Sequence, residues 1–145
     1  MKKICIVTVY KSLNSGSFWQ AKALGIAIER LGYNVVYYKM PYPWMKQVEK
    51  YINIGKLLIK QGWTGMVNYI VGLRDFADNQ KRFPVINSND ADIGCYVLGS
   101  DTIWNLESSS LSSNRSIYWG GKFKGNHIIT YAGSVANSPI GMFLN

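Results

Sequence analysis

The sequence predicts an α/β protein with a Rossmann-like parallel sheet that is flanked by helices. A β-branched run at residues 4–9 precedes an amphipathic helical segment and a second apolar run at residues 35–38. This β-loop-α-β order is typical of doubly wound sheets. A later apolar run at residues 93–98 ends in Gly-Ser-Asp, as expected for a buried parallel strand bounded by a turn. We expect one such domain over residues 1–145.

Composition limits the classes of function. The chain has 145 residues, of which 48% are apolar and 17% charged, so it can bury a core. Sixteen Lys and Arg against eight Asp and Glu give a net charge of +8, which favours anionic partners. His127 is the only histidine and no Cys-x-x-Cys occurs, so we expect no metal site and no Ser-His-Asp triad. No run reaches the ~20 apolar residues of a membrane span, and we expect a cytoplasmic protein.

The first expected strand leads through a loop at residues 11–17 into a helix that Gly32 ends. The apolar face of that helix is expected to hold Ala21, Leu24, Ile28 and Leu31. The loop has a single glycine and is neither a dinucleotide fingerprint nor a Walker loop. The segment Ser15-Gly16-Ser17 lies at the helix N-terminus, which favours an anion. A capped helix on a tight turn is the alternative, and both interpretations stay open.

A basic helical insertion is expected at residues 38–84. Two amphipathic stretches, at 44–59 and 63–77, follow a Pro-rich break. Residues 39–82 carry eight basic and three acidic side chains, a net +5. A basic amphipathic helix with tryptophan can bind an anionic membrane, but an ordinary helix with solvated lysines has the same pattern. Because no recognised nucleic-acid motif accompanies the charge, we do not expect nucleic-acid binding.

The turn Gly99-Ser100-Asp101 follows the strand expected at residues 93–98. Gly99 permits a sharp change of chain direction. Ligands of open α/β sheets bind at the carboxyl ends of the strands, where Ser100 and Asp101 are expected. Asp101 is equally suited to cap a following helix. Beyond it we expect an exposed Ser-rich loop at 107–115, a turn at 120–126 and a last strand at 127–132.

Three segments resemble motifs of the polysaccharide pyruvyl transferase family. They are Asn-Ser-Gly-Ser-Phe-Trp-Gln-Ala at residues 14–21, Gly-Ser-Asp-Thr-Ile-Trp-Asn at 99–105 and Thr-Tyr-Ala-Gly-Ser at 130–134. The family patterns are Asn-aromatic-Gly-Ala/Ser-x-Leu-Gln-Ala, Gly-Ser-Asp-Gln-x-Trp-Asn and Ser-Tyr-Ala-Ala-Ser. The basic insertion, ending in Arg74-Asp75-Phe76 and Arg82-Phe83, also matches. The chain departs from the family at Ser15, Trp19, Gly133 and Val135-Ala136.

The resemblance implies a transferase that moves pyruvate from phosphoenolpyruvate onto sugar hydroxyls as a ketal, without a cofactor. The acceptor would be a sugar or lipid-linked glycan in cell-surface polysaccharide synthesis, handled in the cytoplasm or at the inner membrane face. The family fold is similar to the two-domain glycosyltransferase B type. This chain would be the N-terminal half, a fragment that is inactive alone, because the sequence offers no convincing general acid.

The residues that the resemblance places in substrate binding are Asn14, Gly16, Gln20, Gly99, Ser100, Asp101, Trp104, Tyr131 and Ser134. For Trp104, stacking on a sugar and packing beneath the loop are both open. No catalytic residue is identified, so enzymatic activity itself is an open question. Two alternatives are kept: the N-terminal half of a glycosyltransferase, and a non-catalytic basic module that binds a membrane surface.

Overall fold

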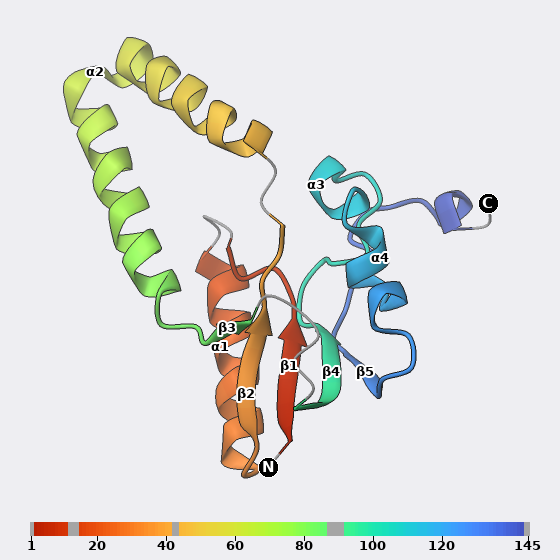
Figure 1. The fold of residues 1–145 in the computed structure, drawn as a ribbon. Coiled ribbons are helices and arrows are strands. Elements are labelled where there is room, and N and C mark those ends of the chain that lie inside the picture. Colours follow the sequence, from red (N-terminus) through yellow and green to blue (C-terminus); the bar gives the residue numbers. More distant parts are fainter. Residues whose placement is uncertain (1, 12–14, 42–43, 87–91, 144–145) are drawn as a thin grey trace. The chain divides into compact units, whose positions relative to one another are not determined.

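The chain contains a five-stranded parallel sheet, shown in a computed structural model that describes residues 2–11, 15–41, 44–86 and 92–143 (Figure 1). The strands lie in the order β3-β2-β1-β4-β5, and every adjacent pair is parallel. Their bounds are β1 Lys3–Val7, β2 Asn34–Tyr38, β3 Val85–Ile86, β4 Ile93–Gly99 and β5 Ile128–Tyr131. The helices are α1 Ser15–Arg30, α2 Trp44–Gln80, α3 Ser109–Ser112, α4 Arg115–Tyr118 and the short 3-10 helices η1 Gly121–Phe123 and η2 Ile140–Phe143. The expected α/β, Rossmann-like architecture is therefore confirmed.

The chain divides into two compact units. Residues 1–39 with 83–145 form the first unit, which contains the sheet, and residues 40–82 form the second. The second unit is the basic segment expected at 38–84, and it consists of α2. The short strand β3, which pairs with β2 through Tyr37↔Val85 and Tyr38↔Ile86, was not predicted. Two residues give too little apolar pattern to identify a strand.

On one face of the sheet α1 packs against the core strands, whereas the side chains of β5 are exposed. Ile6 of β1 pairs with Val97 of β4, and both belong to the main apolar core. The helix contributes three of its predicted residues to this core, Ala21, Leu24 and Ile28. Leu31 was expected beside them, but α1 ends at Arg30 and Leu31 is 74% exposed. Gly32 has a φ of +86° and its N–H donates to the Glu29 carbonyl, so the predicted C-terminal glycine is confirmed.

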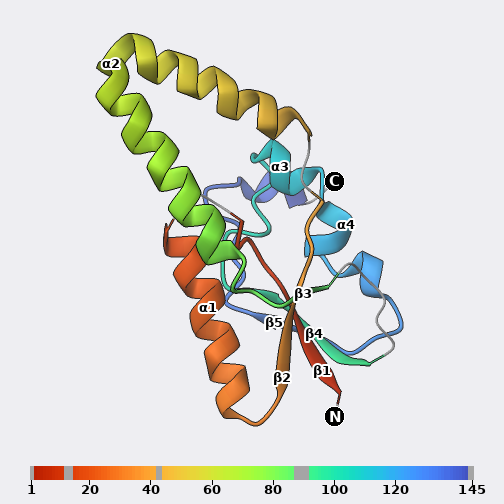
Figure 2. The ribbon, with the colours of Figure 1, turned by 60° about the vertical axis from the view of Figure 1, so that its left-hand side comes forward.

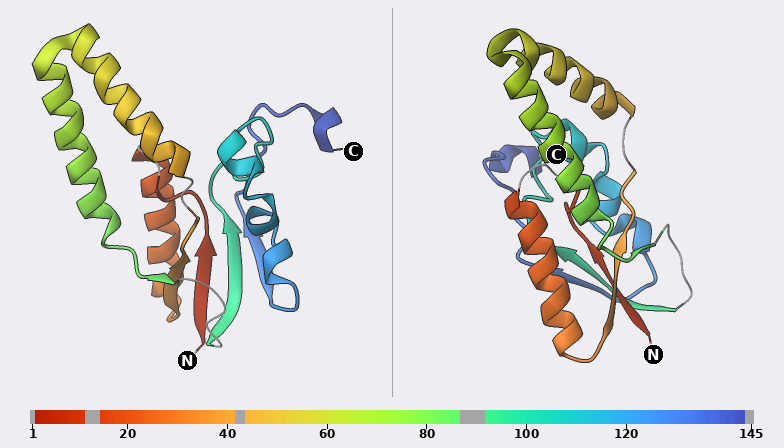
Figure 3. Two further views of the ribbon diagram at one scale, coloured as in Figure 1. Left: turned by 45° about the horizontal axis from the view of Figure 1, so that its top comes forward. Right: turned by 90° about the vertical axis from the view of Figure 1, so that its left-hand side faces the viewer.

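The opposite face is covered by short helices in the β4–β5 connection (Figures 2 and 3). Phe123 of η1 is 1% exposed and stacks on Tyr96, with ring centroids 4.1 Å apart. It also meets Tyr38 edge to face at 5.2 Å. The segments predicted as a Ser-rich loop at 107–115 and a turn at 120–126 thus contain α3 and η1. Those expectations were wrong at these positions, because single helical turns lack the periodicity that marks longer helices.

Gly25 is expected to resist substitution because α1 lies very close to β2 at this point. A Cβ at Gly25 would collide with the Tyr37 hydroxyl, which donates a 2.9 Å hydrogen bond to the Ala21 carbonyl. Gly25→Ala should therefore destabilise the fold by about 1–3 kcal/mol, despite the better helix propensity of alanine. Tyr37→Phe removes the obstacle and should cost about 1 kcal/mol by itself.

The double variant Gly25→Ala/Tyr37→Phe provides the control. We expect it to be more stable than the sum of the single changes by at least ~1 kcal/mol, because the two groups are in direct contact. Chemical denaturation of the four proteins measures this coupling. Strict additivity would show that the Tyr37 hydroxyl is not the obstacle.

The second unit is a long helix with one bend. Gly62, with φ 65° and ψ −165°, interrupts α2 between two helical arms (Figure 1). The two predicted stretches, 44–59 and 63–77, correspond to these arms, and the glycine at the bend agrees with the break between them. Across the described residues, no helix has the length and continuous apolar sequence needed to cross a bilayer.

Candidate functional site

The turn after β4 is bonded directly to the end of β5. The Ser100 N–H donates to the Tyr131 carbonyl at 2.6 Å. Gly99 has a φ of +132°, and a Cβ there would collide with the same carbonyl. One turn further on, the Ser134 N–H donates to the Asp101 carbonyl at 3.0 Å. The segments 99–105 and 130–134 are therefore bonded to each other at the carboxyl edge of the sheet.

This edge is also where the strand order reverses. The chain moves from β1 to β2 on one side and from β4 to β5 on the other, so the reversal lies between β1 and β4. In open α/β sheets such a reversal leaves a crevice beyond the carboxyl ends, where ligands bind. Thr8 directly follows β1 and Ser100 directly follows β4, and both are buried. The two side-chain hydroxyls therefore lie at the position that this topology favours for a ligand.

The hydroxyl of Ser100 has no hydrogen-bond partner among the described residues. Ser100 is 6% exposed, and its backbone has a φ of 65°. A buried hydroxyl without a partner costs about 1–3 kcal/mol, and a non-glycine residue in the left-handed region adds backbone strain. Both costs are typical of binding sites. Among the described residues, the buried hydroxyls of Thr8 and Tyr10, which follow β1, are also without a hydrogen-bond partner.

Asp101 organises the turn and does not begin a helix. Its Oδ1 accepts the Thr102 N–H at 2.6 Å and the Thr102 hydroxyl at 3.3 Å. The next helix, α3, starts at Ser109 with Ser108 at its N-cap, so the interpretation of Asp101 as a helix cap is wrong. An aspartate carboxylate that accepts backbone N–H groups stabilises a turn in the same way as a helix. Sequence alone does not distinguish the two.

Tyr118 lies close to this carboxylate. Burial, and next the negative charge of Asp101, raise the pKa of the Tyr118 hydroxyl, with a smaller contribution from Tyr10. Deprotonation is suppressed, because a phenolate would be desolvated beside a carboxylate. Tyr118 therefore remains a hydrogen-bond donor throughout the physiological pH range.

Trp104 supports the loop through its own contacts. Its Nε1–H donates to the Tyr118 carbonyl at 3.1 Å, and its backbone N–H donates to the Ser134 carbonyl at 3.1 Å. A Cβ at Gly133 would lie 3.1 Å from the indole ring, so the ring packs closely against the chain after β5. A methyl group at residue 133 would therefore require the indole ring to shift by a few tenths of an ångström.

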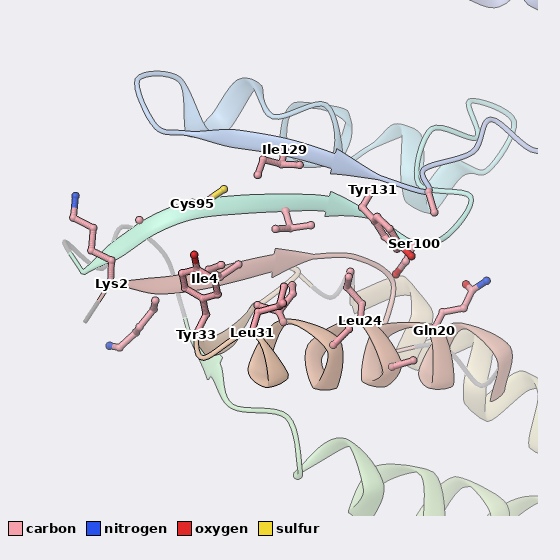
Figure 4. Close-up of a pocket in the computed structure, with 17 residues that line it drawn as sticks. Lys2, Ile4, Gln20, Leu24, Leu31, Tyr33, Cys95, Ser100, Ile129 and Tyr131 are labelled. Atoms are coloured by element: carbon pink, nitrogen blue, oxygen red, sulfur yellow. The ribbon is translucent and has the colours of Figure 1, made fainter.

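An apolar cavity of about 970 Å³ opens between α1 and strands β1, β4 and β5 (Figure 4). Its walls include Ile4, Leu24 and Ile129, and Leu31 lies at its margin. Figure 4 shows Lys2 at one end, whereas Gln20, Ser100 and Tyr131 lie together at the other. Polar side chains therefore line both ends of the cavity, with Lys2 and Tyr33 at one end and Gln20, Ser100 and Tyr131 at the other (Figure 4). The Ser100 hydroxyl, which has no partner among the described residues, lies at the carboxyl edge.

The predicted site residues fall into four groups. Gln20, Ser100 and Tyr131 line the cavity. Gly99, Asp101, Trp104 and Ser134 form the bonded turns beside it. Gly16 lies in the first turn of α1. Asn14 lies outside the described residues.

Sequence reasoning missed Thr8, Tyr10 and Tyr118. Thr8 lies inside the β-branched run at residues 4–9 that was predicted as a strand, whereas β1 ends at Val7. Nothing in the sequence therefore indicated that Thr8 follows the strand. Tyr10 follows the first apolar run and Tyr118 stands in a short aromatic segment. The role of each depends on the tertiary fold. Within the described part of the chain, no three His, Cys, Asp or Glu side chains are grouped to hold a metal ion.

The fold and this edge define the class: a Rossmann-like α/β domain with an apolar cavity, one end of which lies at the carboxyl edge of the sheet. We compared the chain with models of protein families, with curated proteins and with solved structures, and none of them matches.

Proposed function

We propose that this domain is the N-terminal half of a pyruvyl transferase that acts on a sugar or lipid-linked glycan. The reaction would join two sugar hydroxyl oxygens to C2 of phosphoenolpyruvate and break the C2–O bond to phosphate. One hydroxyl proton would reach the methylene carbon, which becomes a methyl group, and the other would leave with phosphate. The fold would be that of the first domain in a glycosyltransferase B-type enzyme, with catalysis requiring the second domain.

The observation that carries this proposal is the bonded pair of turns at the carboxyl edge. Two segments that resemble family motifs, far apart in sequence, are joined there by the hydrogen bonds of Ser100 to Tyr131 and of Ser134 to Asp101. Gln20, from the first motif, lines the same cavity as Ser100. Such convergence is expected if the three motifs serve one ligand, at the edge where the parallel neighbours β4 and β5 both end.

Within this proposal the residues have different tasks. The Ser100 hydroxyl and the Gln20 amide would bind sugar hydroxyls, because both can donate and accept hydrogen bonds. Asp101 would hold the turn that presents Ser100, since its carboxylate accepts two hydrogen bonds from Thr102. The N–H groups in the first turn of α1 would face the phosphate or carboxylate of the donor.

The first experiment uses the chain alone. In ¹⁵N-labelled protein, addition of phosphoenolpyruvate is expected to shift the amide signals of Gly16, Ser100 and Asp101. Amides in the second unit, such as that of Asn68, should be unaffected. Shifts produced by a nucleotide sugar but not by phosphoenolpyruvate would favour the glycosyltransferase alternative. An absence of shifts with either compound at millimolar concentration would count against the site.

Ser100→Ala is expected to reduce ketal formation about 10- to 100-fold once a second domain from a two-domain pyruvyl transferase is supplied. The reason is the loss of a buried hydrogen bond to substrate, about 1–3 kcal/mol. The methyl signal of the ketal in NMR spectra measures product. Ser116→Ala, at an exposed position in α4, is the matched control and should retain activity. Equal activity of the two variants would remove Ser100 from the site.

A further inference from the structure

Apolar side chains are unusually exposed around the bend of α2. Ile59 is 86% exposed and Trp63 is 73% exposed, on either side of Gly62. Ile52 and Val67 are also about half exposed. Large contiguous exposed apolar surfaces are rare on monomeric proteins and typically mark an interaction site. We call Ile52, Lys56, Ile59, Lys60, Trp63 and Val67 the α2 bend surface.

Helical spacing groups these residues on each arm. Ile52, Lys56 and Ile59 are separated by four and three residues, so they share one face of the first arm. Trp63 and Val67 have the same relation on the second arm. Lys56 and Lys60 are exposed, so ammonium groups stand directly beside the exposed apolar side chains. Each arm therefore exposes an apolar face, and the face on the first arm also carries lysine side chains.

Acidic residues are excluded from this part of the chain. From residue 50 to residue 73 the sequence contains three lysines and no aspartate or glutamate. The acidic side chains of the second arm come later, at Asp75 and Asp78, and Asp78 pairs with Lys81 at 2.8 Å. Within residues 50–73 the lysines are therefore not balanced by acidic residues of the same segment.

We propose that the α2 bend surface docks on an anionic phospholipid bilayer. Isoleucine and tryptophan side chains would enter the boundary between headgroups and acyl chains, and the lysines would contact anionic headgroups. Tryptophan is favoured at this boundary, because its ring is apolar and its N–H is polar. A nucleic acid would match the lysines but leave the isoleucines and valine in water. The exposed apolar side chains and the neighbouring lysines agree with a helix that lies on the membrane. This proposal does not depend on the pyruvyl transferase proposal.

The test is co-sedimentation of the full chain with vesicles of phosphatidylcholine alone or with 30% phosphatidylglycerol. We expect binding only to the anionic vesicles, and weaker binding as salt is raised. Ile59→Ser/Trp63→Ser should weaken binding at least tenfold. Its matched control is Ile140→Ser/Trp19→Ser, which changes residues that are 78% and 65% exposed elsewhere in the chain. Lys56→Gln/Lys60→Gln should weaken binding about tenfold or more, whereas Lys39→Gln/Lys124→Gln should have little effect.

Because all of the substituted residues are exposed, we expect each variant to keep its helix content, and circular dichroism measures this. Equal binding of the α2 bend variants and their controls would overturn the proposal. So would equal binding to neutral and anionic vesicles, or no binding at low salt. Light scattering provides a further outcome. A dimer that Ile59→Ser/Trp63→Ser converts to a monomer, without vesicle binding, would show that a second copy covers this surface.

Discussion

Replacing Gly99 by alanine is expected to destabilise the sheet by about 3 kcal/mol or more. The residue has a φ of +132°, a conformation that side chains with a Cβ rarely adopt. The new methyl group would also collide with the Tyr131 carbonyl. That carbonyl accepts the 2.6 Å hydrogen bond of Ser100, so relief of the collision must disturb the β4–β5 junction. Backbone strain and overpacking therefore add at one position.

The measurement is amide hydrogen exchange of β1 and β4 under native conditions. Exchange in the central strands reports the opening of the sheet itself, independently of the α2 unit. Gly125→Ala is the matched control. Gly125 also has a positive φ, of +88°, but nothing lies within 4 Å of a Cβ there. It should cost only about 1–2 kcal/mol, the penalty of a left-handed conformation.

A similar loss of stability in both variants would mean that the positive φ accounts for the whole effect. The Tyr131 carbonyl would then have moved away from the new methyl group at low cost. If Gly99→Ala loses much more stability than Gly125→Ala, the turn after β4 and the end of β5 are held rigidly together. The second result has a functional consequence. Ser100 is placed at the end of the cavity by this junction, so phosphoenolpyruvate titrations of Gly99→Ala should also show weakened shifts.

The elements that sequence predicted well are those with a strong local signal. The run before Gly99 and the β-branched run at residues 4–9 both became central parallel strands, because buried strands need continuous apolar sequence. Gly32 marked the end of α1, since few other residues adopt its conformation. The carboxyl-edge position of Ser100 and Asp101 followed from the polar residues that come directly after an apolar run.

What could not be predicted depends on contacts between distant segments. Asp101 was compatible with a helix cap and with a turn, and only the course of the following chain decides between them. The unpartnered state of the Ser100 hydroxyl is a property of its surroundings, not of its sequence neighbours. Leu31 fitted the helical period, yet α1 had already ended at Arg30. Boundaries of this kind differ by a residue or two from any periodic pattern.

Phe123 is the clearest example, because a sequence of glycines and lysines around it predicts an exposed turn. The structure instead buries Phe123 against the sheet. It stacks on Tyr96 at 4.1 Å and meets Tyr38 at 5.2 Å. The segment has no helical or strand period, so its aromatic residue is the only signal that it belongs to the core. One buried aromatic residue can anchor a segment that is otherwise polar.

Phe123→Ala is therefore expected to cost about 3–5 kcal/mol, as for other buried phenylalanines. A domain of this size has a total stability of about 5–15 kcal/mol, so much of it would be lost. Hydrogen exchange of Tyr96 and its neighbours in β4 measures the change. Phe123→Leu is the control and should cost about 1–2 kcal/mol, because it keeps most of the volume and loses the stacked ring. A small loss of stability in both variants would show that Phe123 does not anchor η1 to the sheet. A large effect of alanine but not of leucine would show that Phe123 is a main apolar anchor of the short helices on this face. Ile117 and Tyr118 of α4 are also buried. The Tyr118 carbonyl accepts the hydrogen bond of the Trp104 indole N–H. Loss of Phe123 should thus loosen the loop that holds Asp101, which links the core of this face to the proposed site.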